Sequence, residues 1–365
     1  MKNALIVLKN SINAFEERDF YTANAFQEEG YFFTDTRIVD ETDEAFLSAT
    51  VIDAFESADN LVIASEKRLL FSVRQTVVSA LGLDFTQKTA LGTGIMERNG
   101  KTLFLTAVER GDAGDGYAKS VCVPYLAEKY ANRFDKLVFR TVGAGRERME
   151  TLFAQAKRMS GEALRYNYRE RFGDEVVEIF YDRTAPRMLT EDVLRLFADE
   201  LSEFLYAMDD TPLEVQIVRL LQLHRRKIAV AESFTGGGVA ARLVSVSGAS
   251  EVYHEGLNTY SEASKAKRLG VPEYVLKTQG AVSDETAYYM ALGLLGEADV
   301  SVATTGLAGP NSDKSGNPVG LSYIAVGTKE NVYVYKYLFQ GTREEITQTA
   351  INFALFQAYK QIKFA

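Results

Sequence analysis

Short apolar runs alternate with longer amphipathic segments through the first third of the chain. Residues 4–8, 31–33 and 60–65 predict strands, and residues 19–29 and 43–57 predict helices. Alternation at this spacing is typical of a parallel, doubly wound α/β sheet. Such a sheet binds ligands beyond the carboxyl ends of its strands, so its chemistry is expected there.

The pattern changes at about residue 136. The strands and helices predicted after this point cover residues 136–140, 146–159, 175–180 and 190–207. We interpret this stretch as a small α+β domain that ends at residues 208–212, where Pro212 suits the first position of a new helix. The chain is therefore expected to form three domains, with boundaries at 1–135, 136–208 and 209–365.

The last third is organised around the segment KIAVAESFTGGG, residues 227–238. Its apolar run, 228–231, fits a short buried strand, although periodicity alone does not separate a strand from a buried helical turn. The glycines and the helix predicted after them would present backbone N–H groups to an anion. The alternative is a tight turn that needs glycine for its backbone angles. The spacing matches neither a nucleotide P-loop nor a dinucleotide-binding motif.

A second glycine turn, TGLAGP at 305–310, follows the strand predicted over 300–304. Two glycine-rich strand ends in one α/β domain favour an anion site more than either does alone. Serines near a lysine add a candidate nucleophile, because a buried lysine with a lowered pKa takes the proton of a hydroxyl. Arg343 is a candidate fixed charge for a phosphate.

Other boundaries in this third are well marked. Residues 261–269 predict a short helix with Ser261 as its N-cap, and Gly270 ends it. Two further strands are predicted over 321–328 and 331–339. This α/β domain, 209–365, is expected to fold independently of the rest.

Composition narrows the function classes. The 365 residues carry a net charge of −9, which argues against nucleic acid as a partner, because phosphate contacts need a clustered basic face. The single cysteine, Cys122, excludes an internal disulfide and is typical of a reducing compartment. No apolar run reaches the roughly 18 residues of a membrane span, and no signal-peptide pattern is present. We expect a cytoplasmic protein without a membrane partner.

Metal and cofactor chemistry is not expected. The two histidines, His224 and His254, are too few for a multi-histidine site, and both are interpreted as structural or surface residues. The segment GDAGDG at 111–116 lacks the spacing and final glutamate of an EF-hand, so a surface loop is favoured. The Tyr- and Arg-rich patch at 165–169 is interpreted as a solvated face.

Several motifs resemble one known family in order and spacing. They are AESFTGGGVAARLVSVSGAS, GLNTYSEASKAKRLGV, GAVSDETA, TTGLAGPNSDKSGNPVG and GTREEITQTAINFAL. They resemble the C-terminal domain of the competence/damage-inducible CinA family, and the resemblance covers residues 212–362. The resemblance implies a nicotinamide-mononucleotide deamidase, which converts the carboxamide of that nucleotide to the acid and releases ammonia. The layout of the whole chain resembles full-length CinA, with a molybdopterin-binding-like α/β domain at the N-terminal end.

The resemblance also implies roles for particular residues. It places the nucleophile at Ser250, its lysine base at Lys265 and an assisting tyrosine at Tyr260. The residues that it implies for substrate binding are Ser233, Thr235, Gly236, Gly237, Thr305, Gly306, Ala308 and Arg343. Phe234 and Thr342 depart from the family pattern, which has cysteine and aspartate there, and Phe234 is expected to narrow the pocket.

The N-terminal half departs further from the family. The metal-dependent hydrolase motifs of the family should fall near residues 9–11, 64–71 and 106–109. In this chain, those positions are KNS, ASEKRLLF and TAVE. Leu70 and Phe71 replace an acidic pair and hold no divalent cation. We expect a retained scaffold without hydrolysis of ADP-ribose.

Three hypotheses follow. The first is a serine–lysine amidohydrolase of pyridine nucleotide metabolism, acting on nicotinamide mononucleotide as a homodimer without a cofactor. The second is a catalytically silent interaction protein, as the eroded N-terminal half suggests. The third is a sensor that binds the nucleotide without turnover because of Phe234. The first is favoured because the reactive residues of the C-terminal part are retained.

Overall fold

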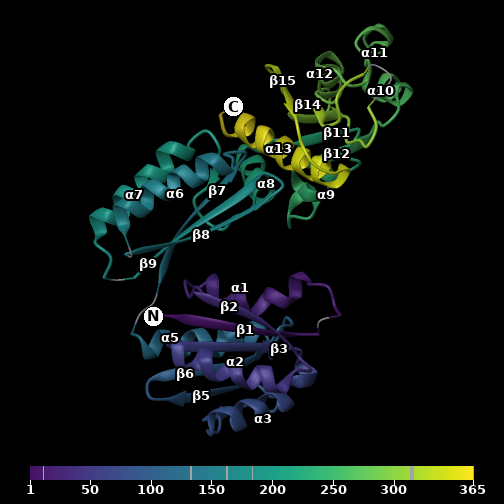
Figure 1. The fold of residues 1–365 in the computed structure, drawn as a ribbon. Helices are drawn as coiled ribbons and strands as arrows, with labels where there is room; N and C mark the ends of the chain where they lie inside the picture. Colours follow the sequence, from purple (N-terminus) through teal and green to yellow (C-terminus); the bar gives the residue numbers. More distant parts are fainter. Residues whose placement is uncertain (11, 132–133, 162, 183, 313–315, 365) are drawn as a thin grey trace. The chain divides into compact units, whose positions relative to one another are not determined.

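The computed structural model describes residues 1–364 except 11, 132–133, 162, 183 and 313–315. Contacts divide it into two compact units, residues 1–135 with 180–185, and residues 136–179 with 186–365. The predicted α/β fold class is confirmed, since three sheets are each combined with helices (Figure 1). Residues 136–179 and 186–208 lie in the same unit as residues 209–365, and the domain boundary expected at 208–209 stays a prediction. Among the described residues, no helix is long and apolar enough to cross a bilayer.

The first unit contains a six-stranded sheet in the order β2-β1-β3-β6-β5-β4. Its strands are β1 Asn3–Lys9, β2 Asp35–Asp40, β3 Asn60–Ser65, β4 Gln87–Lys88, β5 Gly94–Arg98 and β6 Lys101–Ala107. The first four in spatial order are parallel. Strand β5 runs antiparallel to β6, and β4 runs antiparallel to β5. Helices α2 Glu44–Ser57 and α3 Leu70–Leu81 cover one face, and α1 Tyr21–Gln27 and α5 Val123–Lys129 cover the other. The sheet is therefore doubly wound, as predicted.

One predicted strand in this unit is wrong. Residues 31–33 form a loop, and the strand lies at β2 instead. The aromatic run resembles a buried strand because Tyr31 is a core residue. Its ring meets that of Phe134 edge-on, with the ring centroids 5.5 Å apart. The true strand has the polar sequence DTRIVD, which an edge strand tolerates because only part of it is buried.

The four-stranded sheet has the order β10-β7-β9-β8. Its strands are β7 Asp135–Val142, β8 Leu164–Arg171, β9 Asp174–Tyr181 and β10 Leu205–Ala207, and its helices are α6 Arg146–Ser160 and α7 Arg187–Leu201. The helix predicted over 190–207 therefore ends too late, because its last three residues form β10. The patch at 165–169 lies within β8 and is partly exposed.

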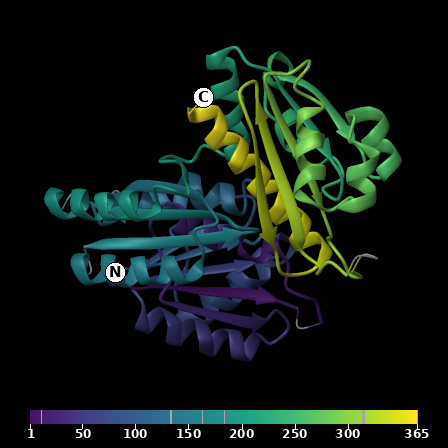
Figure 2. The same cartoon turned by 90° about the horizontal axis from the view of Figure 1, so that it is seen from above.

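The five-stranded sheet in the second unit has the order β12-β11-β13-β14-β15. Its strands are β11 Ile228–Glu232, β12 Tyr253–Asn258, β13 Val300–Gly306, β14 Leu321–Thr328 and β15 Val332–Leu338. The first three in spatial order are parallel, so the ambiguous run at 228–231 is a strand. Helices α8 Leu213–His224, α9 Gly238–Val244 and α13 Arg343–Phe364 pack on one face, where Figure 2 shows α13 in yellow. Helices α10 Glu262–Leu269, α11 Glu273–Thr278 and α12 Asp284–Leu292 pack on the other.

The glycine turn after β11 is held by a carboxylate of the chain itself. Glu232 is 2% exposed, and its two oxygens accept hydrogen bonds from the N–H groups of Gly237, Val239 and Ala240 at 3.0, 3.1 and 2.9 Å. These donors belong to the first turn of α9, which otherwise lacks partners. The expectation that this turn offers its N–H groups to an external anion is therefore wrong at Gly237. Positive φ angles of 64° at Gly236 and 101° at Gly237 bring the turn back onto Glu232.

Replacing Glu232 by alanine is expected to lower the free energy of unfolding by roughly 3 kcal/mol, because three buried or half-buried donors lose their acceptor. Glu232→Gln should lose less, since the amide keeps one oxygen. Urea denaturation measures the effect, with Glu330→Ala at an exposed turn as the control. A Glu232→Ala protein as stable as the control would contradict this role.

Candidate active site

The carboxyl ends of β11, β12 and β13 converge on one short turn. Ser233 follows β11 directly, and its N–H donates to the carbonyl of Thr304 in β13 at 3.1 Å. On the other side, the N–H of Thr259, which follows β12, donates to the carbonyl of Glu232 at 2.8 Å. The hydroxyls of Thr235 and Thr304 lie 2.7 Å apart in the interior. Parallel pairing thus fixes Ser233 between two neighbouring strand ends.

Lys265 reaches this turn from α10. The helix begins at Ser261, whose side chain accepts from the N–H of Ser264 as predicted, and Gly270 ends it. Lys265 is fully buried, and its Nζ lies 2.9 Å from Ser233 Oγ. The same nitrogen donates to the carbonyls of Thr259 at 2.7 Å and of Tyr260 at 3.3 Å. These contacts account for all three N–H groups of an ammonium.

Burial makes this lysine a usable base. Desolvation lowers the pKa of Lys265 from 10.5 to about 8, and the Glu262 carboxylate opposes part of that shift. When the amine is neutral, the two carbonyls take its two N–H groups. Its lone pair then faces Ser233 Oγ. The arrangement can accept the serine proton without moving any side chain.

The predicted pairing of Lys265 with Ser250 is corrected by these contacts. Ser250 lies in the short 3-10 turn Ala249–Glu251, with an exposed side chain, and the bonds of Lys265 leave it no donor. The sequence placed Lys265 nearer to Ser250 along the chain, but strand register brings it to Ser233. Tyr260 contributes its backbone carbonyl, while its ring is 69% exposed.

The facing loop after β13 holds the remaining predicted residues. Thr305 donates its hydroxyl to the carbonyl of Ala281 at 2.6 Å, and Ala308 is buried. Arg343 is exposed and donates to the carbonyl of Gly309 at 2.7 Å, so it lies beside this loop. Phe234 belongs to the hydrophobic core. Its ring lies so close to Gly306 that a Cβ on that glycine would be 2.9 Å from the ring. The ring therefore packs into the interior, and Gly306 leaves room for it.

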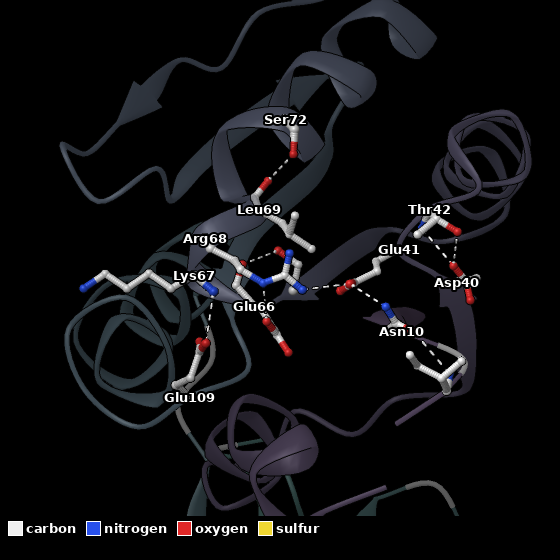
Figure 3. A network of polar contacts seen from close by, with 12 residues as sticks. Asn10, Asp40, Glu41, Thr42, Glu66, Lys67, Arg68, Leu69, Ser72 and Glu109 are labelled. Atoms are coloured by element: carbon white, nitrogen blue, oxygen red, sulfur yellow. Dashed lines mark hydrogen bonds and ion pairs between the residues drawn. The ribbon is translucent and has the colours of Figure 1, made fainter. Parts of the chain in front are cut away.

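A polar network lies at the strand ends of the first unit (Figure 3). Arg68 bridges two carboxylates, donating to Glu41 Oε1 and to Glu66 Oε2, both at 2.7 Å. The backbone N–H of Lys67 donates to Glu109 at 3.0 Å. The bonds to Glu41 and Glu66 raise the pKa of Arg68 further, so a fixed cation sits between these acids. Across the described residues, no group of three His, Cys, Asp or Glu is arranged to hold a metal ion.

This network was not predicted from the sequence. The strand end predicted after residue 65 is followed by Glu66, Lys67 and Arg68. It was expected to carry no chemistry because it lacks an acidic pair. Glu41 follows β2, a strand that the sequence did not predict, so its place at the same edge was not visible.

Comparisons with known proteins agree with the C-terminal assignment. Residues 210–362 match the model of the CinA C-terminal domain. A Caldicellulosiruptor bescii protein, named among the competence-damage inducible proteins, is 32% identical over 272 residues, covering 73% of this chain and 66% of the relative. A Caldicellulosiruptor saccharolyticus relative with the same name is 34% identical over 239 residues, covering 64% of this chain and 58% of the relative. The chain thus spans less than two thirds of the length of both relatives.

Two solved structures are similar to part of the chain in sequence. The crystal structure of the competence/damage inducible protein CihA from Agrobacterium tumefaciens is 33% identical, with a TM-score of 0.40, and the match covers 43% of this chain and 99% of that one. A CinA superfamily protein from Escherichia coli is 31% identical, with a TM-score of 0.40, over 43% of this chain and 94% of that one. Residues 210–362 of the chain therefore belong to the CinA C-terminal domain family.

Proposed function

We propose that this protein is an amidohydrolase in which Ser233 is the nucleophile and Lys265 its base. One observation carries the proposal: Lys265 Nζ lies 2.9 Å from Ser233 Oγ, while two backbone carbonyls hold its other bonds. A serine hydroxyl is a weak nucleophile until a positioned base takes its proton. Complete burial of Lys265 favours the neutral amine that this step needs.

In the first half-reaction, Ser233 Oγ attacks the carbonyl carbon of the amide and its proton passes to Lys265. The N–H groups of Phe234 and Thr235 follow the nucleophile and make no hydrogen bond with any described residue, so they are the proposed donors to the oxyanion. Lys265 then protonates the leaving nitrogen, the C–N bond breaks and ammonia departs. Water, deprotonated by Lys265, hydrolyses the resulting ester and regenerates Ser233.

The proposed substrate is nicotinamide mononucleotide, which the resemblance to the CinA C-terminal domain implies. Its carboxamide would meet Ser233, and Arg343 beside the loop after β13 would bind its phosphate. The buried position of Phe234 favours an active enzyme over a sensor, since the ring packs into the core. The cytoplasmic location and the homodimer remain predictions.

Ser233→Ala is expected to reduce ammonia release from nicotinamide mononucleotide by at least about 1,000-fold, because the nucleophile is lost. Calorimetry should still detect substrate binding to this variant. Ser250→Ala is the matched control and should keep wild-type turnover, since Ser250 is exposed and Lys265 has no donor left for it. Loss of turnover in Ser250→Ala, with turnover retained in Ser233→Ala, would reverse the assignment.

The pH profile should report Lys265. Only the neutral amine accepts the serine proton, so kcat/KM should rise about tenfold per pH unit below about 8 and level off above it. Glu262→Gln removes a carboxylate that raises the pKa of Lys265, so the profile should shift to lower pH. Glu273→Gln, at an exposed position of α11, should leave it unchanged. A profile that is flat across this range would exclude Lys265 as the base.

A further inference from the structure

A cavity in the second unit shares no lining residue with the Ser233 site. It has a volume of about 740 Å³ and lies between the last turns of α13, strand β15, the end of β7 and the segment that joins α7 to β10. Pockets for small molecules commonly measure about 300–1,000 Å³. Its size therefore suits a small ligand, and its lining indicates which kind.

Aromatic rings form one wall of the cavity. Phe353 and Tyr337 meet edge-on, with ring centroids 5.0 Å apart. Gly143 and Gly173 flank the Phe353 ring so closely that a Cβ on either would lie 2.7 or 2.8 Å from it. The N–H of Gly143 donates to the carbonyl of Gly173 at 2.9 Å, which holds the two glycines together. The wall is thus formed in advance of any ligand, which reduces the entropy cost of binding.

The polar groups of the cavity are only partly satisfied. The carboxamide of Gln357 is 5% exposed, and its Nε2 donates to the Tyr337 hydroxyl at 2.6 Å. Its Oε1 has no partner among the described residues, and in either orientation of the amide one end stays unpaired. Burial raises the pKa of Tyr337 to about 12, so the hydroxyl keeps its proton near neutral pH. A buried polar atom without a partner is rare in native structures and indicates a missing ligand or water.

Lys360 lies one helical turn after Gln357 and supplies the charge. It is half-buried, lines the cavity, and has its Nζ 4.9 Å from the centroid of the Phe356 ring. Its Nζ makes no hydrogen bond or ion pair within the part of the chain that the structure describes. Burial lowers the pKa of Lys360, and the Glu203 carboxylate opposes that shift. A partly desolvated amine gains most from an anion that shares its environment.

We infer that this cavity binds a small aromatic acid, with its ring against Phe353 and Tyr337 and its anionic group at Lys360 Nζ. A purely apolar ligand would leave Lys360 without a partner. An anion would accept from Lys360, and also from Gln357 Nε2 in the amide orientation in which the Tyr337 hydroxyl donates to Oε1. A cationic ligand would meet Lys360 at close range. An aromatic ring with a carboxylate or sulfonate group satisfies the aromatic wall and the amine together.

The full-length protein can be titrated with anilinonaphthalene sulfonate, an aromatic sulfonate whose fluorescence rises in apolar sites, and with phenylnaphthylamine, which has the same rings without the sulfonate. One saturable sulfonate site per chain is expected. Lys360→Gln should weaken sulfonate binding by about tenfold, because a charge-assisted hydrogen bond is lost, and leave the neutral compound unaffected. Lys277→Gln, at an exposed lysine of α11, should change neither.

Ser202→Trp places a large ring among the lining residues and should abolish the site. Equal sulfonate affinity in Lys360→Gln and wild type would overturn the inference, as would binding that survives Ser202→Trp. If Lys360→Gln does not fold, Tyr337→Phe provides a second test. It removes the hydroxyl donor and should weaken binding of the sulfonate but not of the neutral compound. An unchanged affinity in that variant would equally contradict the proposal.

Discussion

The burial of Lys265 is the constraint on which the candidate active site depends. An amine removed from water must find hydrogen-bond partners, and three oxygens surround this one. Two of them are backbone carbonyls of Thr259 and Tyr260, which join β12 to α10. The length of that connection decides whether the lysine points back at the strand end. The third oxygen, Ser233 Oγ, stands there because β11 and β12 pair in parallel.

The polar groups at the carboxyl ends of the parallel strands find hydrogen-bond partners in different ways in the two units. In the C-terminal sheet, Glu232 accepts from the first turn of α9, and the N–H groups next to Ser233 are the ones that the proposed mechanism uses. In the N-terminal sheet, Arg68 bridges Glu41 and Glu66, so the site that a doubly wound sheet offers is occupied by the side chains of the chain itself. The proposed chemistry therefore uses the strand ends of the C-terminal sheet.

Sequence reasoning predicted most elements of the C-terminal sheet because their boundaries are marked by local chemistry. Ser261 caps α10 and Gly270 ends it, and strand β14 was predicted with its observed bounds. The pairing of Ser233 with Lys265 was not predicted, since the two residues are 32 positions apart and strand register, rather than sequence proximity, brings them together. Strand β2 was missed for a related reason, because an edge strand needs little apolar sequence.

A nucleophilic Ser233 would carry the acyl group during turnover, and rapid quenching followed by peptide mass spectrometry detects this group on the chain. Trypsin cleaves after Lys227 and Arg242, so Ser233 and Ser250 fall on different peptides, and Ser233 is the sole serine of its own. After brief exposure to nicotinamide mononucleotide, the peptide 228–242 is expected to gain the mass of the acyl group. An acyl group on the peptide that contains Ser250, with none on 228–242, would contradict the account.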